Sequence, residues 1–396
     1  MKKVLFMLSS MDIGGVEKSL LSLLSVMPKE AYDVKILLLE EKGAFLDHLP
    51  DWVRVEEASW YQEVKPIIMQ SPYKTIKDFY AAKTYSRIPS FVYSYLISEK
   101  VLKDRYIYYK HIFKSVPLHE EDYDIAVAYQ GPTDIIDYYV GHHVNAVKKI
   151  SWVHFDVSKH SVNTKLYQQL YQRFDMVLVV SNEAHNHLVD KIPSVKFKSD
   201  VCKNIVSKTA IKVMSKETAD FDKEYTGRII VTVGRLSWEK GQDMAIAVLS
   251  WLREEGYDVK WYCVGGGKQR AEYEQMIEGY GLKDHFILTG PSPNPYPYIA
   301  QADIYVQPSR HEGYCLSLAE AKCLQRPIVT TDFTGANEQI IDGYNGLISK
   351  CNADALYYHV KYLLAHPDQA DKLALNLSAT KDDRSSTASS PVNMIQ

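Results

Sequence analysis

The sequence predicts an α/β protein with two domains, each built on a parallel, doubly wound sheet. Short apolar runs alternate with stretches that carry apolar residues at helical spacing, and this order is typical of parallel sheets covered by helices. The series stops near residue 204, passes through a polar segment at 207–227, and resumes at Ile229. The 396 residues are enough for two cores of ordinary size. We therefore expect domains at 1–204 and 205–378, followed by a polar, Ser-rich tail at 379–396 whose composition is typical of disorder.

The composition excludes several classes of protein. The formal net charge is −3, which argues against a dedicated nucleic-acid binder. No apolar stretch approaches the ~18 residues of a membrane span. The five cysteines are scattered and form no Cys-x-x-Cys pair, so we expect a cytoplasmic protein with neither a disulfide framework nor a structural zinc.

The first domain is expected to begin with a buried strand at 4–8, a turn at Gly14-Gly15, a helix at 16–27 and a second strand at 34–39. The turn does not match Gly-x-Gly-x-x-Gly, so the dinucleotide fingerprint is absent here. Two interpretations of the glycine pair stay open. It is either a tight turn or a loop that lets a phosphate or sugar approach the backbone.

Residues 64–118 are distinctly basic and aromatic. They contain ten Lys or Arg residues against three Asp or Glu, with eleven Phe and Tyr residues interleaved. A helical segment of this kind is attracted to an anionic membrane surface, where each basic group contributes about 1 kcal/mol. The alternative is a solvated helical insertion whose aromatic side chains pack inward. Single-stranded nucleic acid is disfavoured by the overall charge.

Three further strands are expected at 124–129, 149–153 and 176–180, and each ends in polar residues. In an open α/β sheet, ligands bind at the carboxyl ends of the strands. His154 follows one such end and is a candidate functional residue. The alternative is a hydrogen-bonded structural histidine.

In the second domain, a strand at 229–233 leads into a glycine-flanked turn that carries Arg235 and Lys240, and then into a helix at 243–255. Arg offers a planar fork and Lys a point charge, so the pair can clamp a diphosphate. Each residue alone is more simply explained as a solvated surface charge. Further strands are expected at 259–264, 286–290, 304–307 and 327–329, and a closing helix at 356–364.

The segment from Pro308 to Ala321 reads as a turn that joins a strand to a helix. Such an arrangement directs backbone N–H groups and a positive helix dipole at an anion. Glu312 and Glu320 are eight residues apart, roughly 12 Å if the whole segment were helical. That distance does not suit one acid/base pair acting on one bond. It suits two groups that hold opposite ends of a long ligand, with a phosphate between them.

With these residues in place, the sequence resembles the family-4, retaining GT-B glycosyltransferases. The resemblance is carried by Gly234-Arg235-Leu236-x-x-x-Lys240-Gly241 and by Glu-x7-Glu from Glu312 to Glu320. Supporting matches are Gly14-Gly15, Asn294-Pro295-Tyr296 and Asn345-Gly346-Leu347. The resemblance covers residues 1 to about 375, and it implies two Rossmann-like domains that face each other across a cleft.

The resemblance also implies the roles of the site residues. Arg235 and Lys240 would hold the donor diphosphate, Glu312 the donor sugar and Glu320 the ribose, while His154 would lie near the transferred sugar. The catalytic residues carried over are His154, Arg235, Lys240 and Glu312. The donor-binding residues are Gly14, Gly15, Arg235, Lys240, Gly290, Gly313, Tyr314, Cys315, Leu316 and Glu320.

The implied function is transfer of a hexose from a nucleotide-diphosphate sugar to a hydroxyl of a glycan or lipid-diphosphate-linked acceptor, with retained anomeric configuration. Uridine is the commonest base in this family. We expect no cofactor and no metal, because cations are already provided and no convincing Asp-x-Asp loop is present. A role in bacterial surface or capsular polysaccharide synthesis, on the inner face of the membrane, would explain the basic aromatic segment.

Alternatives stay open. They are another GT-B reaction, such as nucleotide-sugar epimerisation or phosphorolysis, and a non-catalytic glycosyltransferase partner subunit. Two features depart from the family pattern. Lys203-Asn204-Ile205-Val206 lacks the usual glycine after asparagine, and the polar tail lacks the pattern of the helix that normally returns to the first domain.

Overall fold

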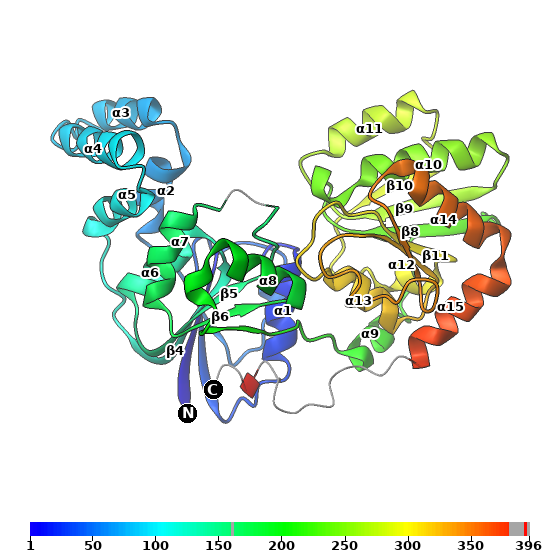
Figure 1. Cartoon of the computed structure of the whole chain (residues 1–396), viewed down its shortest axis with the longest axis horizontal. Helices are drawn as coiled ribbons and strands as arrows, with labels where there is room; N and C mark the ends of the chain where they lie inside the picture. The colour runs from blue at the N-terminus through cyan, green and yellow to red at the C-terminus, as the bar shows by residue number, and fades with distance from the viewer. Residues whose placement is uncertain (160–161, 380–391, 394–396) are drawn as a thin grey trace.

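The computed structural model describes residues 1–159, 162–379 and 392–393. Its strands form one sheet of seven and one of six, and the pairings between these strands are parallel. Helices pack on both faces of each sheet (Figure 1). The predicted fold class, two doubly wound α/β domains, is confirmed.

The first sheet has the strand order β3-β2-β1-β4-β5-β6-β7. Its strands are β1 (Lys2–Leu8), β2 (Tyr32–Leu38), β3 (Arg54–Glu57), β4 (Asp122–Gly131), β5 (Asn145–Val153), β6 (Met176–Val179) and β7 (Ser199–Val201). Its helices are α1 (Gly15–Leu24), α2 (Tyr61–Met69), α3 (Pro72–Ala81), α4 (Arg87–Tyr95), α5 (Arg105–Ile112), α6 (Asp134–His143), α7 (Thr164–Leu170) and α8 (Asn182–Lys191). Short 3-10 turns are η1 (Leu46–His48), η3 (Phe113–Ser115), η4 (Tyr171–Arg173) and η5 (Pro193–Val195), and η2 (Leu96–Val101) is a π-helical turn.

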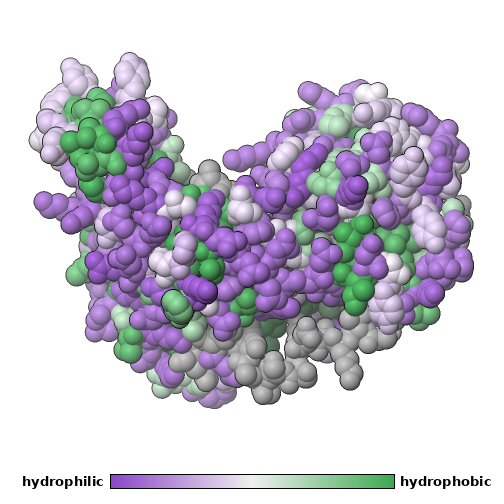
Figure 2. All heavy atoms as spheres, viewed as in Figure 1, coloured by the Kyte–Doolittle hydropathy of each residue, from purple (hydrophilic) through white to green (hydrophobic). Residues whose placement is uncertain are grey.

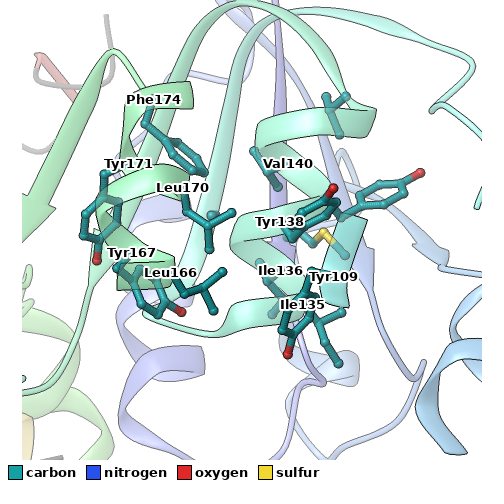
Figure 3. Close-up of a cluster of buried hydrophobic side chains, with 14 of the residues drawn as sticks. Tyr109, Ile135, Ile136, Tyr138, Val140, Leu166, Tyr167, Leu170, Tyr171 and Phe174 are labelled. Carbon is teal, nitrogen blue, oxygen red and sulfur yellow. The ribbon is translucent and has the colours of Figure 1, made fainter. Parts of the chain in front are cut away.

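Alternating side chains of these strands enter two different cores, because successive residues of a strand point to opposite faces. Leu5 of β1 lies in the core under α2, α5, α6, α7 and α8, whereas Val4 lies in the core that α1 covers. Figure 3 shows α6 and α7 directing apolar side chains, such as Ile136 and Leu170, into the first of these cores. The apolar runs of the sequence therefore form strands buried on both faces.

The second sheet has the order β10-β9-β8-β11-β12-β13. Its strands are β8 (Arg228–Val233), β9 (Val259–Val264), β10 (Phe286–Gly290), β11 (Ile304–Gln307), β12 (Ile328–Thr331) and β13 (Leu347–Ser349). Its helices are α10 (Gln242–Glu254), α11 (Arg270–Gly279), α12 (Tyr296–Gln301), α13 (Leu316–Cys323), α14 (Ala353–Ala365) and α15 (Pro367–Ala379), with the 3-10 turn η6 (Trp238–Lys240). Trp261 and Tyr262 of β9 point into opposite cores of this domain.

Residues 202–227 join the two sheets, and the predicted domain boundary at 204/205 falls in this segment. The segment contains a helix, α9 (Lys208–Met214), that the sequence pattern does not indicate. Ser207 caps it by accepting a hydrogen bond from the Ala210 N–H (3.3 Å). Ile211 is its one buried residue and packs in the second domain, so no apolar periodicity is visible in the sequence.

The predicted polar tail lies outside the described residues apart from 379 and 392–393. Val392 is partly buried against the core of the first domain that α1 covers. The described end of the chain therefore contacts the first domain, although the sequence lacks the expected pattern for a returning helix.

Residues 61–115 form a helical arm of α2 to α5 with η2 and η3. Figure 1 shows α3 and α4 at the end of this arm, farthest from the sheet. Phe91, Tyr108, Tyr109 and Phe113 are buried in the core of the first domain. The inward-packing interpretation of the aromatic residues therefore holds for this part of the set.

Candidate active site

Each sheet reverses its strand order at one place, and open α/β sheets bind ligands at that point beyond the carboxyl ends of the strands. In the first sheet the reversal lies between β1 and β4, and in the second between β8 and β11. Gly14-Gly15 follow β1, and Gln130 lies at the end of β4. Arg235 follows β8, and Glu312 follows β11. The predicted glycine turn, cation turn and acidic turn thus all lie at the two reversal points.

On the first-domain side, a buried carboxylate lies beside the glycine turn. Glu17 of α1 is 6% exposed, and its Oε2 is 2.3 Å from where a Cβ on Gly14 would lie. Gln130 Nε2 donates to Glu17 Oε1 (3.5 Å), and Gln130 accepts from the Ser9 N–H (2.7 Å). Burial raises the pKa of Glu17 to about 7, and the Arg235 charge from the second domain opposes this rise. The charge of Arg235 therefore acts on Glu17 across the domain interface.

His154 follows β5 and lies in the contact between the domains. Its ring packs against Tyr129 at 4.7 Å and stacks on Trp152 at 5.8 Å between ring centroids. Burial lowers the pKa of His154 to about 3, so the imidazole is neutral at physiological pH. Its Nε2 is buried without a hydrogen-bond partner among the described residues. A neutral ring with one unpartnered nitrogen can bind a ligand hydroxyl.

On the second-domain side, the turns after β8 and β11 are joined by polar contacts. Lys240 Nζ lies 2.5 Å from Glu312 Oε1, which also accepts from the Ser309 hydroxyl (2.8 Å). The guanidinium of Arg310 forms a fork on Asp243, with N–O distances of 2.7 and 2.6 Å. Burial alone would lower the pKa of Lys240, but the Glu312 charge holds it above its usual value. The Lys240 ammonium therefore stays protonated beside Glu312.

Arg235 differs from Lys240. Its side chain is exposed and forms no ion pair within residues 1–159, 162–379 and 392–393. Its backbone carbonyl is held by Gln242 Nε2 at 2.9 Å, which fixes the turn. Of the two predicted diphosphate cations, Arg235 is free to meet an anion, and Lys240 is already paired.

The turn that precedes α13 has an unusual backbone. Cys315 has φ +63, a left-handed conformation that is uncommon for a non-glycine residue and is often found at functional sites. Gln339 Nε2 donates to the carbonyls of Tyr314 and, at 3.4 Å, of Cys315. The predicted phosphate position, at the N–H groups of Tyr314 to Leu316, thus lies on a turn held in place by side-chain contacts.

Glu320 lies in α13, the helix that follows this turn. It is 4% exposed, and its Oε1 accepts from the Tyr296 hydroxyl at 3.1 Å. The same oxygen lies 2.8 Å from Lys18 Nζ of the first domain. Glu312 and Glu320 thus each hold a lysine, one from the same domain and one from the other.

Several contacts close the two domains on each other. The Ser181 hydroxyl donates to the Gly313 carbonyl (2.8 Å), and Thr334 Oγ1 donates to Asp156 Oδ2 (2.6 Å). Glu338 accepts from the Glu183 N–H at 3.0 Å. A cavity of about 470 Å³ lies beside these contacts and is lined by residues of both domains, including Glu183 and Thr334. Figure 2 shows the surface hollowed between the two domains.

The structure brings Arg235, Lys240, Glu312 and the turn at 313–316 together, with Gly14, Gly15 and His154 opposite. Gly290 lies apart from them at the end of β10, on the far side of β9 from β8, where it bridges Gly265. Sequence reasoning overlooked Glu17 and Lys18. Their position directly after the glycine turn was the sequence signal that could have marked them as candidate site residues.

Among the described residues, no group of three or more His, Cys, Asp or Glu side chains could hold a metal ion. Within the same ranges, no helix combines the length and the apolar character that crossing a membrane requires. No disulfide joins any two cysteines in the described ranges.

The fold and the facing reversal points define a protein of the two-domain GT-B class. Residues 214–378 match the family model described as glycosyl transferases group 1, which covers the second domain and less than half of the chain. The structures of HepE from Anabaena with UDP and glucose and of TarM from S. aureus have this fold. Their TM-scores are 0.66 and 0.65, their identities 16% and 14%, and they cover 96% of this chain; the alignments span 94% of HepE and 96% of TarM.

Curated relatives match over part of their length. An alpha-D-kanosaminyltransferase of Streptomyces kanamyceticus is 30% identical over 155 residues, which are 37% of this chain and 39% of the relative. The N-acetylgalactosamine-N,N'-diacetylbacillosaminyl-diphospho-undecaprenol 4-alpha-N-acetylgalactosaminyltransferase of Campylobacter jejuni is 25% identical over 222 residues, 56% of this chain and 59% of the relative. The chain thus spans roughly two to three fifths of these two relatives.

Proposed function

We propose that this protein is a retaining glycosyltransferase that moves a sugar from a nucleotide-diphosphate sugar, with uridine as the base, to a hydroxyl of a glycan or lipid-diphosphate-linked acceptor. The observation that carries the proposal is the position of Arg235, which forms no ion pair among the residues that the structure describes. It lies beside the Lys240–Glu312 pair and faces Gly14-Gly15 across the domain interface. The resemblance to the family, the matched group-1 model and the UDP-bound structural neighbours support it.

The proposed chemistry follows from charge. Breaking the sugar–phosphate bond develops positive charge on the sugar and negative charge on the leaving diphosphate. Arg235 and Lys240 would stabilise the latter by fixed electrostatics, and the Glu312 carboxylate would hold the sugar hydroxyls. The closed domains would exclude water, which otherwise hydrolyses the donor. The acceptor hydroxyl would attack on the same face, and the departing phosphate would help take its proton.

A donor screen tests this proposal. Purified protein is melted with a panel of nucleotide-sugars, and a matching donor at about 100 times its Kd is expected to add about 2.7 kcal/mol to the unfolding free energy. Hydrolysis of the donor, unchanged by EDTA, is the second readout. Epimerisation without acceptor, or dependence on phosphate, would point to another GT-B reaction instead. Stabilisation by no nucleotide-sugar would contradict the proposal and favour a non-catalytic subunit.

Gly15→Ala provides a matched variant for this screen. No atom lies within 4 Å of a Cβ built on Gly15, so the change is expected to alter the unfolding free energy by less than about 0.5 kcal/mol. If the donor lies against this glycine, its affinity falls while the ligand-free protein melts as before.

We also propose that the end of the helical arm binds an anionic membrane, which would place the enzyme beside a lipid-linked acceptor in bacterial surface or capsular polysaccharide synthesis. Tyr73 and Tyr80 of α3 and Tyr93 of α4 are 68%, 67% and 69% exposed. Lys77 Nζ lies 4.7 Å from the Tyr73 ring centroid. Figure 2 shows apolar and weakly polar side chains gathered on the lobe formed by α3 and α4. Basic groups together with exposed aromatic rings match the chemistry of a membrane interface.

Binding to vesicles tests this surface. We expect sedimentation with vesicles that contain anionic lipid, and a loss of binding as salt rises from about 0.05 to 0.5 M, because the Debye length shortens. The double variant Tyr73→Ser/Tyr93→Ser should bind several-fold more weakly. Tyr358→Ser is the control, because Tyr358 is 68% exposed on α14 of the other domain. Equal loss in both variants, or no binding at low salt, would remove the membrane assignment.

A further inference from the structure

Helix α1 reaches across the domain interface through Lys18. Its ammonium lies 2.8 Å from Glu320 Oε1 of α13 and 4.4 Å from the ring centroid of Tyr296. The Lys18 side chain is 21% exposed and that of Glu320 is 5% exposed. The contact is therefore a largely buried ion pair between domains, whose loss would leave a buried carboxylate without its cation.

In this ion pair, Lys18 occupies the carboxylate that the proposed function needs as a hydrogen-bond acceptor for the donor ribose. A ribose offers hydroxyl donors, and Glu320 is the carboxylate assigned to them. A carboxylate oxygen has about two lone-pair positions. Lys18 and the Tyr296 hydroxyl, at 2.8 and 3.1 Å, already occupy those of Oε1. A ribose that binds Glu320 through both oxygens has to replace the ammonium.

The neighbouring residue of α1, Glu17, also interacts with a residue assigned to the donor. The Glu17 carboxylate interacts electrostatically with Arg235, which is assigned to the diphosphate. Two consecutive side chains of α1, Glu17 and Lys18, therefore interact with residues assigned to the donor.

We propose that Lys18 competes with the ribose of the bound nucleotide for Glu320, so that donor binding exchanges an interdomain ion pair for ribose–carboxylate hydrogen bonds. This inference rests on the proposed function. It makes Lys18 a specificity-determining residue. A ligand without ribose hydroxyls offers Glu320 no hydrogen bonds in exchange for its ion pair with Lys18. A ligand with them restores the partners of Glu320.

The inference is tested by whether removing the Lys18 charge strengthens or weakens the binding of UDP. Lys18→Met keeps the stem of the side chain and removes its charge, and we expect UDP to bind about tenfold more tightly by calorimetry, because the variant loses a contact of the free state only. Lys18→Arg restores the charge and should return the Kd toward that of the wild type. With 2′,3′-dideoxy-UDP, the gain in Lys18→Met should disappear, because a ligand without these hydroxyls does not compete with Lys18 for Glu320 in the wild type.

Lys203→Met is the matched control. Lys203 also forms a cross-domain ion pair, 3.5 Å from Glu338, but not at Glu320. Its Kd for UDP should stay within about twofold of the wild type. Unchanged or weaker binding by Lys18→Met, an equal gain in Lys203→Met, or a gain that persists with the dideoxy ligand would each overturn the inference. If the wild-type protein binds neither UDP nor GDP, that result would instead contradict the proposed function on which the inference about Lys18 rests.

Discussion

Replacing Lys240 by methionine is expected to lower kcat/KM for sugar transfer by about a thousandfold, the upper range for removing one electrostatic contact to a developing anion. The change also leaves the Glu312 carboxylate, 9% exposed, with the Ser309 hydroxyl as its remaining partner. Breaking a buried pair in this way costs about 3 kcal/mol of unfolding free energy. Steady-state kinetics and chemical denaturation measure the two effects separately.

The double variant Lys240→Met/Glu312→Gln separates stability from catalysis. It removes the lone buried charge and keeps the hydrogen bond from Ser309, so most of the lost stability should return. Transfer should stay at or below the level of the single variant, because the cation is still missing and the carboxylate has been removed as well. Activity that recovers together with stability would mean that the pair supports the fold alone.

Gly313→Ala is expected to reduce transfer at least a hundredfold while each domain stays folded. A Cβ at this position would lie 2.4 Å from the His154 carbonyl oxygen and 2.8 Å from Phe155 Cα, both backbone atoms of the other domain. Backbone atoms at such distances have to move apart, so the domains cannot close fully. Misplacement of catalytic groups by about 1 Å can cost a hundredfold in rate.

The Gly313→Ala variant should show larger dimensions in small-angle scattering and an unchanged far-UV circular dichroism spectrum. Gly279→Ala in α11 is its control, because no atom lies within 4 Å of a Cβ there. Wild-type turnover in Gly313→Ala would show that the closed arrangement of the domains is not needed for the reaction.

The fold could be predicted because its strongest signals are local. Buried strands such as β1 and β9 are largely apolar, since both of their faces are covered by helices. The elements that escaped prediction lack such runs. β7 has three residues, none of them fully buried, and owes its strand conformation to pairing with β6. α9 buries Ile211 alone.

The candidate site divides in the same way. Arg235 and Lys240 share one turn, and Glu312 and Glu320 share one strand–turn–helix segment, so their grouping is visible in the sequence. Their partners are not. Lys240 meets Glu312 because β8 and β11 are neighbours in the sheet, and Lys18 meets Glu320 because the domains close on each other.

By itself, the sequence determined two parallel α/β domains and the glycine, cation and acidic turns at the ends of particular strands, because apolar periodicity and turn chemistry act within a few residues. Only the tertiary structure decided which of these charges are already paired. Strand order and domain closure bring together groups that are far apart in the chain, and the energy of a charge depends on its neighbours in space. That is why Arg235 forms no ion pair within the described part of the chain, Lys240 is paired with Glu312, and Glu320 is held by a lysine of the other domain.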